Sequence, residues 1–94
     1  MHERALMDDV MRKVDAVAQE NGAIRVTRIG VRLGVLSHFT PEHFREHFAD
    51  ASRGTLAEGA AVDAVLEEDI ESPRATGVVL ESLEVEVPDP KETG

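Results

Sequence analysis

The spacing of the apolar residues changes from a helical period to a strand-like alternation along this chain, and this change constrains the fold most. Asn21-Gly22 marks the first transition, because glycine adopts the left-handed conformation that ends a helix without a steric penalty. Before it, apolar side chains recur at steps of three and four residues, which predicts an amphipathic helix over residues 3–21. Its apolar face comprises Leu6, Met7, Val10, Met11, Val14, Val17 and Ala18.

Three later segments, residues 24–33, 60–68 and 78–87, alternate apolar with polar or small residues and predict strands with one buried face. The alternation changes phase near Thr27-Arg28 in the first segment and near Glu81 in the third. Such a change indicates a bulge or a change of the covering element. The predicted inward residues of the second and third strands are Val62, Ala64, Leu66, Leu83, Val85 and Val87.

A second helix is predicted to begin at Thr40-Pro41-Glu42, with threonine as the N-cap, proline at the first helical position and an acid in the first turn. Arg53-Gly54 ends it, and Thr55 to Glu58 has the spacing of a capping box for one further turn. Its predicted inward residues are Phe44, Phe48 and Ala51.

These elements predict an α/β (α+β) two-layer fold, in which a three-stranded mixed sheet carries two helices on one face in the order α-β-α-β-β. We expect the second and third strands to pair antiparallel across a short link. With 94 residues there is room for one domain, residues 1–88, with a link at 69–77 and a flexible tail at 89–94. The predicted core consists of Leu6, Val10, Val14, Val17, Ile29, Val31, Leu33, Phe44, Phe48, Leu83 and Val85.

The charge and composition exclude several classes of function. A net charge of -9 repels phosphate backbones and anionic lipids, so we expect neither a nucleic-acid nor a membrane partner. The absence of cysteine excludes disulfides and thiolate sites. No basic segment followed by a long apolar run opens the chain, so we expect a cytoplasmic protein. Residues 63–94 hold ten acidic and two basic residues, a pattern more typical of solvated strand faces than of a docking surface for a basic partner.

The most informative candidate site is His2. In Met1-His2 the terminal amine, the His2 amide nitrogen and the His2 imidazole lie close enough along the chain to chelate one metal in a plane, which suits Ni(II) or Cu(II) better than Zn(II). Glu3 could add an oxygen ligand or accept a hydrogen bond from the imidazole. The large second residue disfavours removal of Met1. An exposed histidine without a role is the alternative.

The other histidines, His38, His43 and His47, are candidate auxiliary metal ligands. Residues 43–47 match the His-x-x-Glu-His pattern of inverted zinc peptidases. Such an enzyme needs a third ligand from a later helix and a substrate cleft, and neither is predicted. An exposed helix face whose histidine pair binds metal incidentally is the simpler interpretation. His38 could join that pair or face His2, and no feature of the chain supports an enzyme.

Four segments of the chain stand out as a set: Met1-His2-Glu3, residues 25–34 (RVTRIGVRLG), residues 54–60 (GTLAEGA) and residues 80–86 (LESLEVE). In this order, over nearly the whole chain, they resemble the HypA/HybF family of nickel metallochaperones of hydrogenase maturation. The resemblance implies Ni(II) binding by the Met1 amine, His2 and Glu3. The acidic residue that some members place at the start of the second helix corresponds to Thr40, so that contribution is lost unless His38 or Glu42 replaces it.

Residues 69–77 stand where this family carries a zinc domain with two Cys-x-x-Cys pairs, so we expect no structural zinc. This implies either a natural zinc-free relative or an engineered minimal nickel domain. The resemblance implies a HypB-like GTPase or a hydrogenase large-subunit precursor as partner, and a monomer or weak homodimer. The alternative is a metal-free interaction module that retains the fold and docks to a maturation partner.

Overall fold

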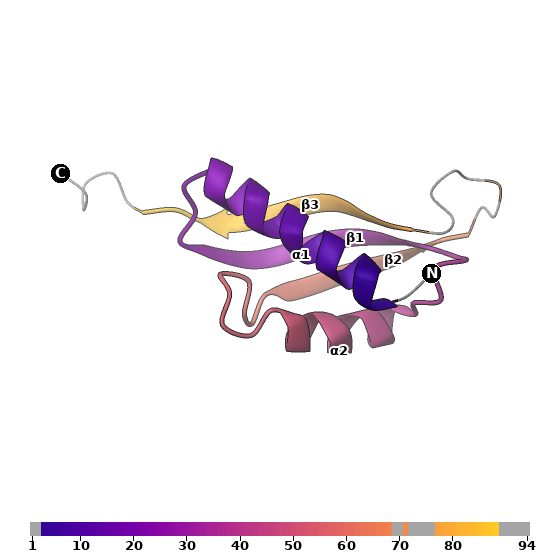
Figure 1. The fold of residues 1–94 in the computed structure, drawn as a ribbon. Coiled ribbons are helices and arrows are strands. Elements are labelled where there is room, and N and C mark those ends of the chain that lie inside the picture. Colours follow the sequence, from indigo (N-terminus) through magenta and orange to yellow (C-terminus); the bar gives the residue numbers. More distant parts are fainter. Residues whose placement is uncertain (1–2, 69–70, 72–76, 89–94) are drawn as a thin grey trace.

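The order of elements matches the predicted one. The computed structural model describes residues 3–68, 71 and 77–88. Within these residues lie α1 (Glu3–Glu20), β1 (Arg25–Gly34), α2 (Pro41–Ala51), β2 (Ala61–Glu67) and β3 (Val78–Glu86). The two helices form one layer and the three-stranded mixed sheet forms the other (Figure 1). The predicted α+β fold class is therefore confirmed.

The strand order is β2-β1-β3, so the predicted antiparallel pairing of the second and third strands is wrong. Instead, β1 lies in the centre, parallel to β2 and antiparallel to β3. The α2 crossover allows β1 and β2 to pair in parallel, as in a β-α-β unit. The burial pattern agrees with this position, because the inward residues of β1 are almost fully buried, whereas those of β2 and β3 other than Val78 are half-buried or exposed.

Both predicted phase changes occur as irregularities in the β1–β3 register. One lies between Val26 and Arg28, and the other lies at Glu81, where Gly30 pairs with Ser82 but Val31 pairs with Leu80. The first irregularity returns Val26 to the same buried face as Ile29, although simple alternation places them on opposite faces. The Val26 N–H then donates to the Leu56 carbonyl oxygen at 2.8 Å, which fixes the turn after α2 on the sheet.

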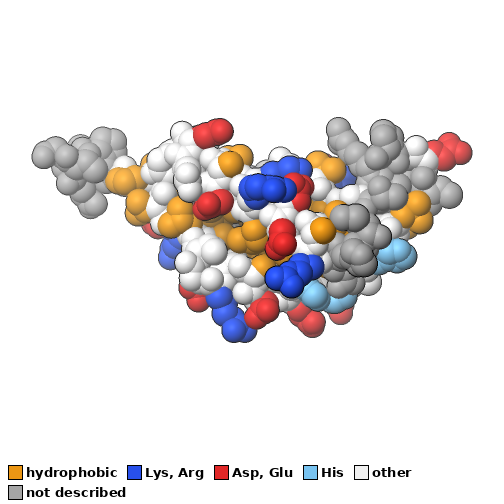
Figure 2. Space-filling model, viewed as in Figure 1, with side chains coloured by type: hydrophobic (Ala, Val, Ile, Leu, Met, Phe, Trp, Pro, Cys, Tyr) orange, Lys and Arg blue, Asp and Glu red, His pale blue; other side chains and the backbone are white. Residues whose placement is uncertain are grey.

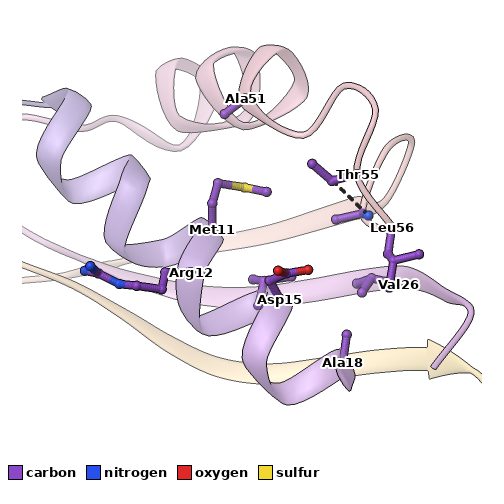
Figure 3. A pocket seen from close by; sticks show the side chains of 10 residues that line it. Met11, Arg12, Asp15, Ala18, Val26, Ala51, Thr55 and Leu56 are labelled. Carbon is purple, nitrogen blue, oxygen red and sulfur yellow. Dashed lines mark hydrogen bonds between the residues drawn. The ribbon is translucent and has the colours of Figure 1, made fainter. Parts of the chain in front are cut away.

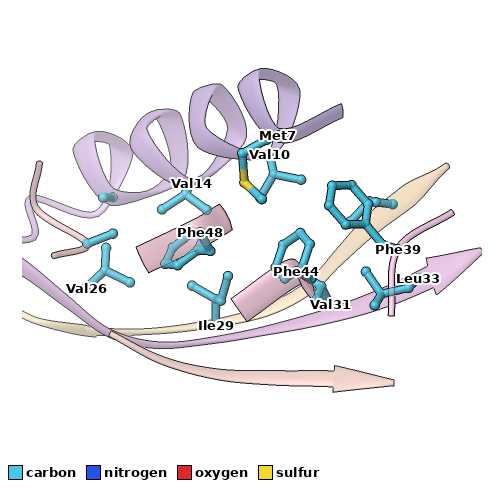
Figure 4. Close-up of a cluster of buried hydrophobic side chains, with 13 residues drawn as sticks. Met7, Val10, Val14, Val26, Ile29, Val31, Leu33, Phe39, Phe44 and Phe48 are labelled. Atoms are coloured by element: carbon cyan, nitrogen blue, oxygen red, sulfur yellow. The ribbon is translucent and has the colours of Figure 1, made fainter. Parts of the chain in front are cut away.

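The core fills the space between the helices and one face of the sheet (Figure 4). Phe44 and Phe48 are its largest fully buried side chains, as predicted. Three predicted inward residues are instead exposed. Ala51 faces a groove at the end of α2, and Leu66 and Val87 lie near or beyond the ends of edge strands. The buried hydrophobic residues that form the core are Met7, Val10, Val14, Ala18, Val26, Ile29, Val31, Leu33, Phe39, Phe44, Phe48, Ala57 and Val78.

The opposite face of the sheet carries ion pairs that radiate from the central strand. Arg28 reaches Asp63 on β2 at 2.8 Å and Glu84 on β3 at 3.8 Å, and its hydrogen bond to Asp63 raises the pKa of the guanidinium. Arg32 reaches Glu81 on β3 at 2.9 Å and Glu67 on β2 at 3.8 Å, and its hydrogen bond to Glu81 raises the pKa of the guanidinium. The acids of β2 and β3 that pair with Arg28 and Arg32 therefore lie on a solvated strand face, beside the cations of β1.

The helix stop and the helix cap predicted from the sequence are both present in the structure. Gly22 has φ 64°, in the left-handed region that ends α1. Thr40 is the N-cap of α2, and its hydroxyl accepts a hydrogen bond from the His43 N–H at 3.1 Å. Most of the predicted link 69–77 and all of the predicted tail 89–94 lie outside the described residues.

Candidate metal centre

The predicted N-terminal donors are only partly described. Met1 and His2 lie outside the described residues, and Glu3 is described only as the first residue of α1, without its side chain. Figure 1 shows that α1 begins at the end of the molecule where β1 ends and α2 begins. The described first turns of α1 share a groove with the second half of α2.

A groove of about 530 Å³ joins the first turns of α1 to α2. From α1 it is lined by Arg4, Met7 and Asp8, and from α2 by His47, Asp50 and Ala51. Two carboxylates and one imidazole thus face a single hollow, although they are far apart in the sequence. No sequence motif marks Asp8 or Asp50 as a candidate ligand, because only the packing of α1 against α2 brings them to the same groove as His47.

His43 and His47 form a close pair on α2. Their ring centroids are 4.4 Å apart with an interplanar angle of 80°, and both residues are half-buried. Phe39 lies against both rings, at 5.7 Å from His43 and 6.0 Å from His47. Histidine side chains are visible at the lower right of the surface in Figure 2. The i, i+4 spacing thus brings two imidazoles together, as the sequence predicted.

The structure does not bring His38 into this pair. His38 is exposed and has φ 69°, a left-handed conformation that is uncommon for a residue other than glycine. On either side of it, Ser37 and Phe39 are buried, and the Ser37 hydroxyl donates to the Gly34 carbonyl oxygen at 2.7 Å. The loop therefore buries Phe39 and leaves His38 at the surface, so His38 is the weakest of the three auxiliary candidates.

The described residues do not reproduce a catalytic zinc centre. Within residues 3–68, 71 and 77–88, no three His, Cys, Asp or Glu side chains gather around a point that could hold a metal ion. Glu46, the central acid of the His-x-x-Glu-His pattern, is exposed. At the start of α2, Thr40 uses its hydroxyl as a cap, and Glu42 is exposed in the first turn.

A second pocket, of about 270 Å³, lies between α1 and the turn after α2 (Figure 3). Its walls are mostly apolar and include Met11, Val14 and Val26. The charged groups at its rim are engaged elsewhere, since Arg12 donates to Asp9 at 2.8 Å and Asp15 accepts from Gln19 at 3.3 Å. This pocket is lined mainly by apolar side chains, and its described residues contain no group of converging metal ligands.

Comparisons with known proteins agree on one family. A model of the family described as "HypA: Hydrogenase/urease nickel incorporation, metallochaperone, hypA" matches residues 1–85. The chain is 41% identical over 63 residues to the hydrogenase maturation factor HypA of Chlorobium limicola, a match that covers 67% of this chain and 54% of that protein. It is 39% identical over 67 residues to the factor of the same name from Archaeoglobus fulgidus, covering 71% and 61%. The chain therefore spans less than two thirds of the length of these relatives.

A solved structure has the same fold. The solution structure of the Ni metallochaperone HypA from Helicobacter pylori superposes with a TM-score of 0.77, covering 94% of this chain and 100% of that chain at 20% sequence identity. At this identity the likeness concerns the fold alone. No helix among the described residues is long and apolar enough to cross a membrane.

Proposed function

Because this chain belongs to the HypA family of hydrogenase and urease nickel-incorporation metallochaperones, we propose that it carries Ni(II) during the maturation of a nickel enzyme. The observation that supports this most directly is that the family match begins at Met1-His2-Glu3, where the chain has three potential ligands in succession. Directly after these residues in the sequence, Arg4 lines the described groove of α1 and α2, which holds two carboxylates and an imidazole.

The proposed ligand set is the Met1 amine, the His2 amide nitrogen and imidazole, and Glu3 as an oxygen ligand or hydrogen-bond acceptor for the imidazole. Three nitrogens in a plane suit Ni(II), whereas Zn(II) gains less from this geometry. Nickel is the cargo of such a protein, so the site has to release the metal as well as bind it. By resemblance, the proposed partners are a HypB-like GTPase or a hydrogenase large-subunit precursor.

We further propose that the chain holds no structural zinc. It has no cysteine, and thiolates are the usual ligands of structural zinc sites. Metal analysis of purified, untagged protein is then expected to find no zinc that survives dialysis. Stoichiometric zinc whose removal unfolds the chain would contradict this proposal.

Calorimetric Ni(II) titration of untagged protein tests the N-terminal site. We expect His2→Ala to abolish tight binding without unfolding the protein, and an N-terminal Gly-Ser extension to do the same by removing the free Met1 amine. Glu3→Gln should weaken binding less. The double variant His43→Ala/His47→Ala is the matched control, because it removes two imidazoles from α2 and should leave the tight site intact.

The affinity should fall as the pH is lowered, because protons compete with the metal for the same nitrogens. Imidazoles take up protons at about pH 6.5 and α-amines at about pH 7.7–8.0, so the loss of affinity should be greatest between about pH 8 and 6.

Retention of tight binding in His2→Ala, with its loss in the α2 double variant, would contradict the N-terminal site. If the wild type binds nickel no better than micromolar, the metal-free interaction module is the better function.

A further inference from the structure

The histidine pair of α2 has the features of a metal site in its own right. His43 and His47 are one helical turn apart, and their ring centroids are only 4.4 Å apart. At this spacing the nitrogens of both rings can reach one metal ion after small side-chain rotations. Paired imidazoles one turn apart on a helix are a recurring ligand arrangement for zinc.

Phe39 restricts the positions of both rings. It lies 5.7 Å from His43 and 6.0 Å from His47, and it is itself buried against Phe44 at 5.4 Å. The imidazoles therefore rest on an aromatic wall that belongs to the core, and each loses less rotamer freedom when a metal binds. Such preorganisation increases affinity without any additional contact.

The groove beside His47 supplies oxygen donors. Asp50 lies three residues after His47 on α2, and Asp8 faces it from α1 across the groove. The Asp50 side chain is 73% exposed and pairs with Arg53 at 3.0 Å, so it can rotate toward the histidines at little cost. In the described part of the chain no three such ligands are already gathered, so the two imidazoles are the fixed part and a carboxylate would complete the set.

We propose that His43 and His47 form a second divalent-metal site, separate from the N-terminal one, with Asp50 or Asp8 as an oxygen ligand and water in the remaining position. Two imidazoles and one carboxylate suit Zn(II) and also accept Ni(II) or Cu(II). This set lacks the planar amide chelate proposed for Met1-His2. It should therefore hold its metal more weakly and discriminate less against zinc. The proposal does not depend on nickel binding at the N-terminus.

Zn(II) titration of a chain with an N-terminal Gly-Ser extension isolates this site, because the extension removes the Met1 amine from the N-terminal set. We expect one equivalent of zinc to bind with a Kd of roughly micromolar magnitude. His43→Ala and His47→Ala should each weaken binding by about tenfold or more, since even the loss of an outer-shell partner has that effect. His47→Gln fills similar space without a ring nitrogen and should behave like His47→Ala.

His38→Ala is the matched control, because it removes an exposed imidazole from the loop before α2 and should leave zinc binding unchanged. The ring protons of His43 and His47 in nuclear magnetic resonance spectra should shift on addition of zinc, whereas those of His38 should not. Circular dichroism establishes that each variant is folded. No zinc binding to the extended chain, or binding that survives His43→Ala/His47→Ala, would overturn the proposal.

The extended chain also separates this proposal from a single shared site. If the α2 imidazoles were ligands of the N-terminal metal, the wild type would bind one equivalent and the extension would abolish it, which would overturn the second site. Two equivalents in the wild type and one in the extended chain would support it. Failure of nickel binding in His2→Ala alone bears only on the proposed N-terminal site.

Discussion

At the scale of single residues, Phe39 connects the core to the candidate metal ligands. Its ring is 3% exposed and meets Phe44 edge-on on one side and the two α2 histidines on the other. The left-handed backbone at His38 makes this possible, because it turns the chain so that Phe39 is buried while His38 is exposed. Phe39 is thus a positioning residue for the histidine pair rather than a ligand.

Asp9 gives a pH dependence whose sign can be worked out. Hydrogen bonds from Lys13 and Arg12 lower the pKa of Asp9 below its usual 3.8. A carboxylate with a lowered pKa in the folded state adds stability above its unfolded pKa, and this stability is lost as the pH falls through the folded pKa. Asp9→Asn should therefore reduce the free energy of unfolding by about 0.5 kcal/mol at pH 7. The difference from wild type should shrink below pH 3.8.

Urea denaturation of wild type and Asp9→Asn at pH 7 and at a pH below 3.8 measures the two free energies of unfolding. Asp8→Asn is the control, since it makes the same change of charge one residue away, where no ion pair is found among the described residues, and its effect should be smaller at pH 7. If the difference in free energy of unfolding between Asp9→Asn and wild type grows toward acid pH, the pKa of Asp9 is not lowered in the folded protein.

At the scale of elements, α2 depends on signals at its first turn. Thr40 caps the helix, Pro41 occupies its first position and Glu42 places a negative charge near its positive end. From this start the helix carries Phe44 and Phe48 into the core and His47 to the groove, with His43 one turn before His47. The same eleven residues therefore provide both packing and candidate ligands.

Replacing the cap should weaken α2 by a predictable amount. Thr40→Ala removes the acceptor of the His43 N–H, and the free energy of unfolding should fall by about 1 kcal/mol. Thr40→Asp should restore most of this, because a carboxylate is an equally good cap and also interacts favourably with the helix dipole. Thermal and urea unfolding test both variants. Equal stability of Thr40→Ala and wild type would show that the cap contributes nothing.

At the scale of the whole molecule, the sheet separates two kinds of surface. One face is covered by both helices and holds the core. The other is open and is crossed by ion pairs from Arg28 and Arg32 of the central strand to acids of both edge strands. Gly30 lies between these arginines, and a side chain at its position would collide with the Ser82 hydroxyl. The described candidate ligands on α1 and α2 belong to the helical layer, on the other side of the sheet from the open face.

A chain that ends at Pro88 should fold as well as the full chain, because the described core lies between Met7 and Val78 and β3 ends at Glu86. We expect the two free energies of unfolding to agree within about 0.5 kcal/mol. A chain that ends at Leu83 is the contrast, since it loses the pairing of Val26 with Val85 and the apolar contact of Val85 with the core. The free energy of unfolding of this shorter chain should be lower by about 2 kcal/mol or more. A large loss on removing only residues 89–94 would show that the domain extends beyond residue 88.

The features that depend on neighbours along the chain are predictable from the amino-acid sequence. The periods of α1 and the strands, the Gly22 stop, the Thr40 cap and both register changes of the β1–β3 pair could be predicted, because each follows from local backbone geometry. The closeness of His43 and His47 was also predictable, since a helix brings residues four apart onto one face.

Which elements lie side by side follows from the three-dimensional packing of the chain. This packing placed β1 between β2 and β3, so that the strand with the most buried residues is the central one. It buried Phe39 and exposed His38, and it brought Asp8 of α1 to His47 of α2. These contacts join residues distant in sequence, and their energies depend on helix packing that no local pattern encodes.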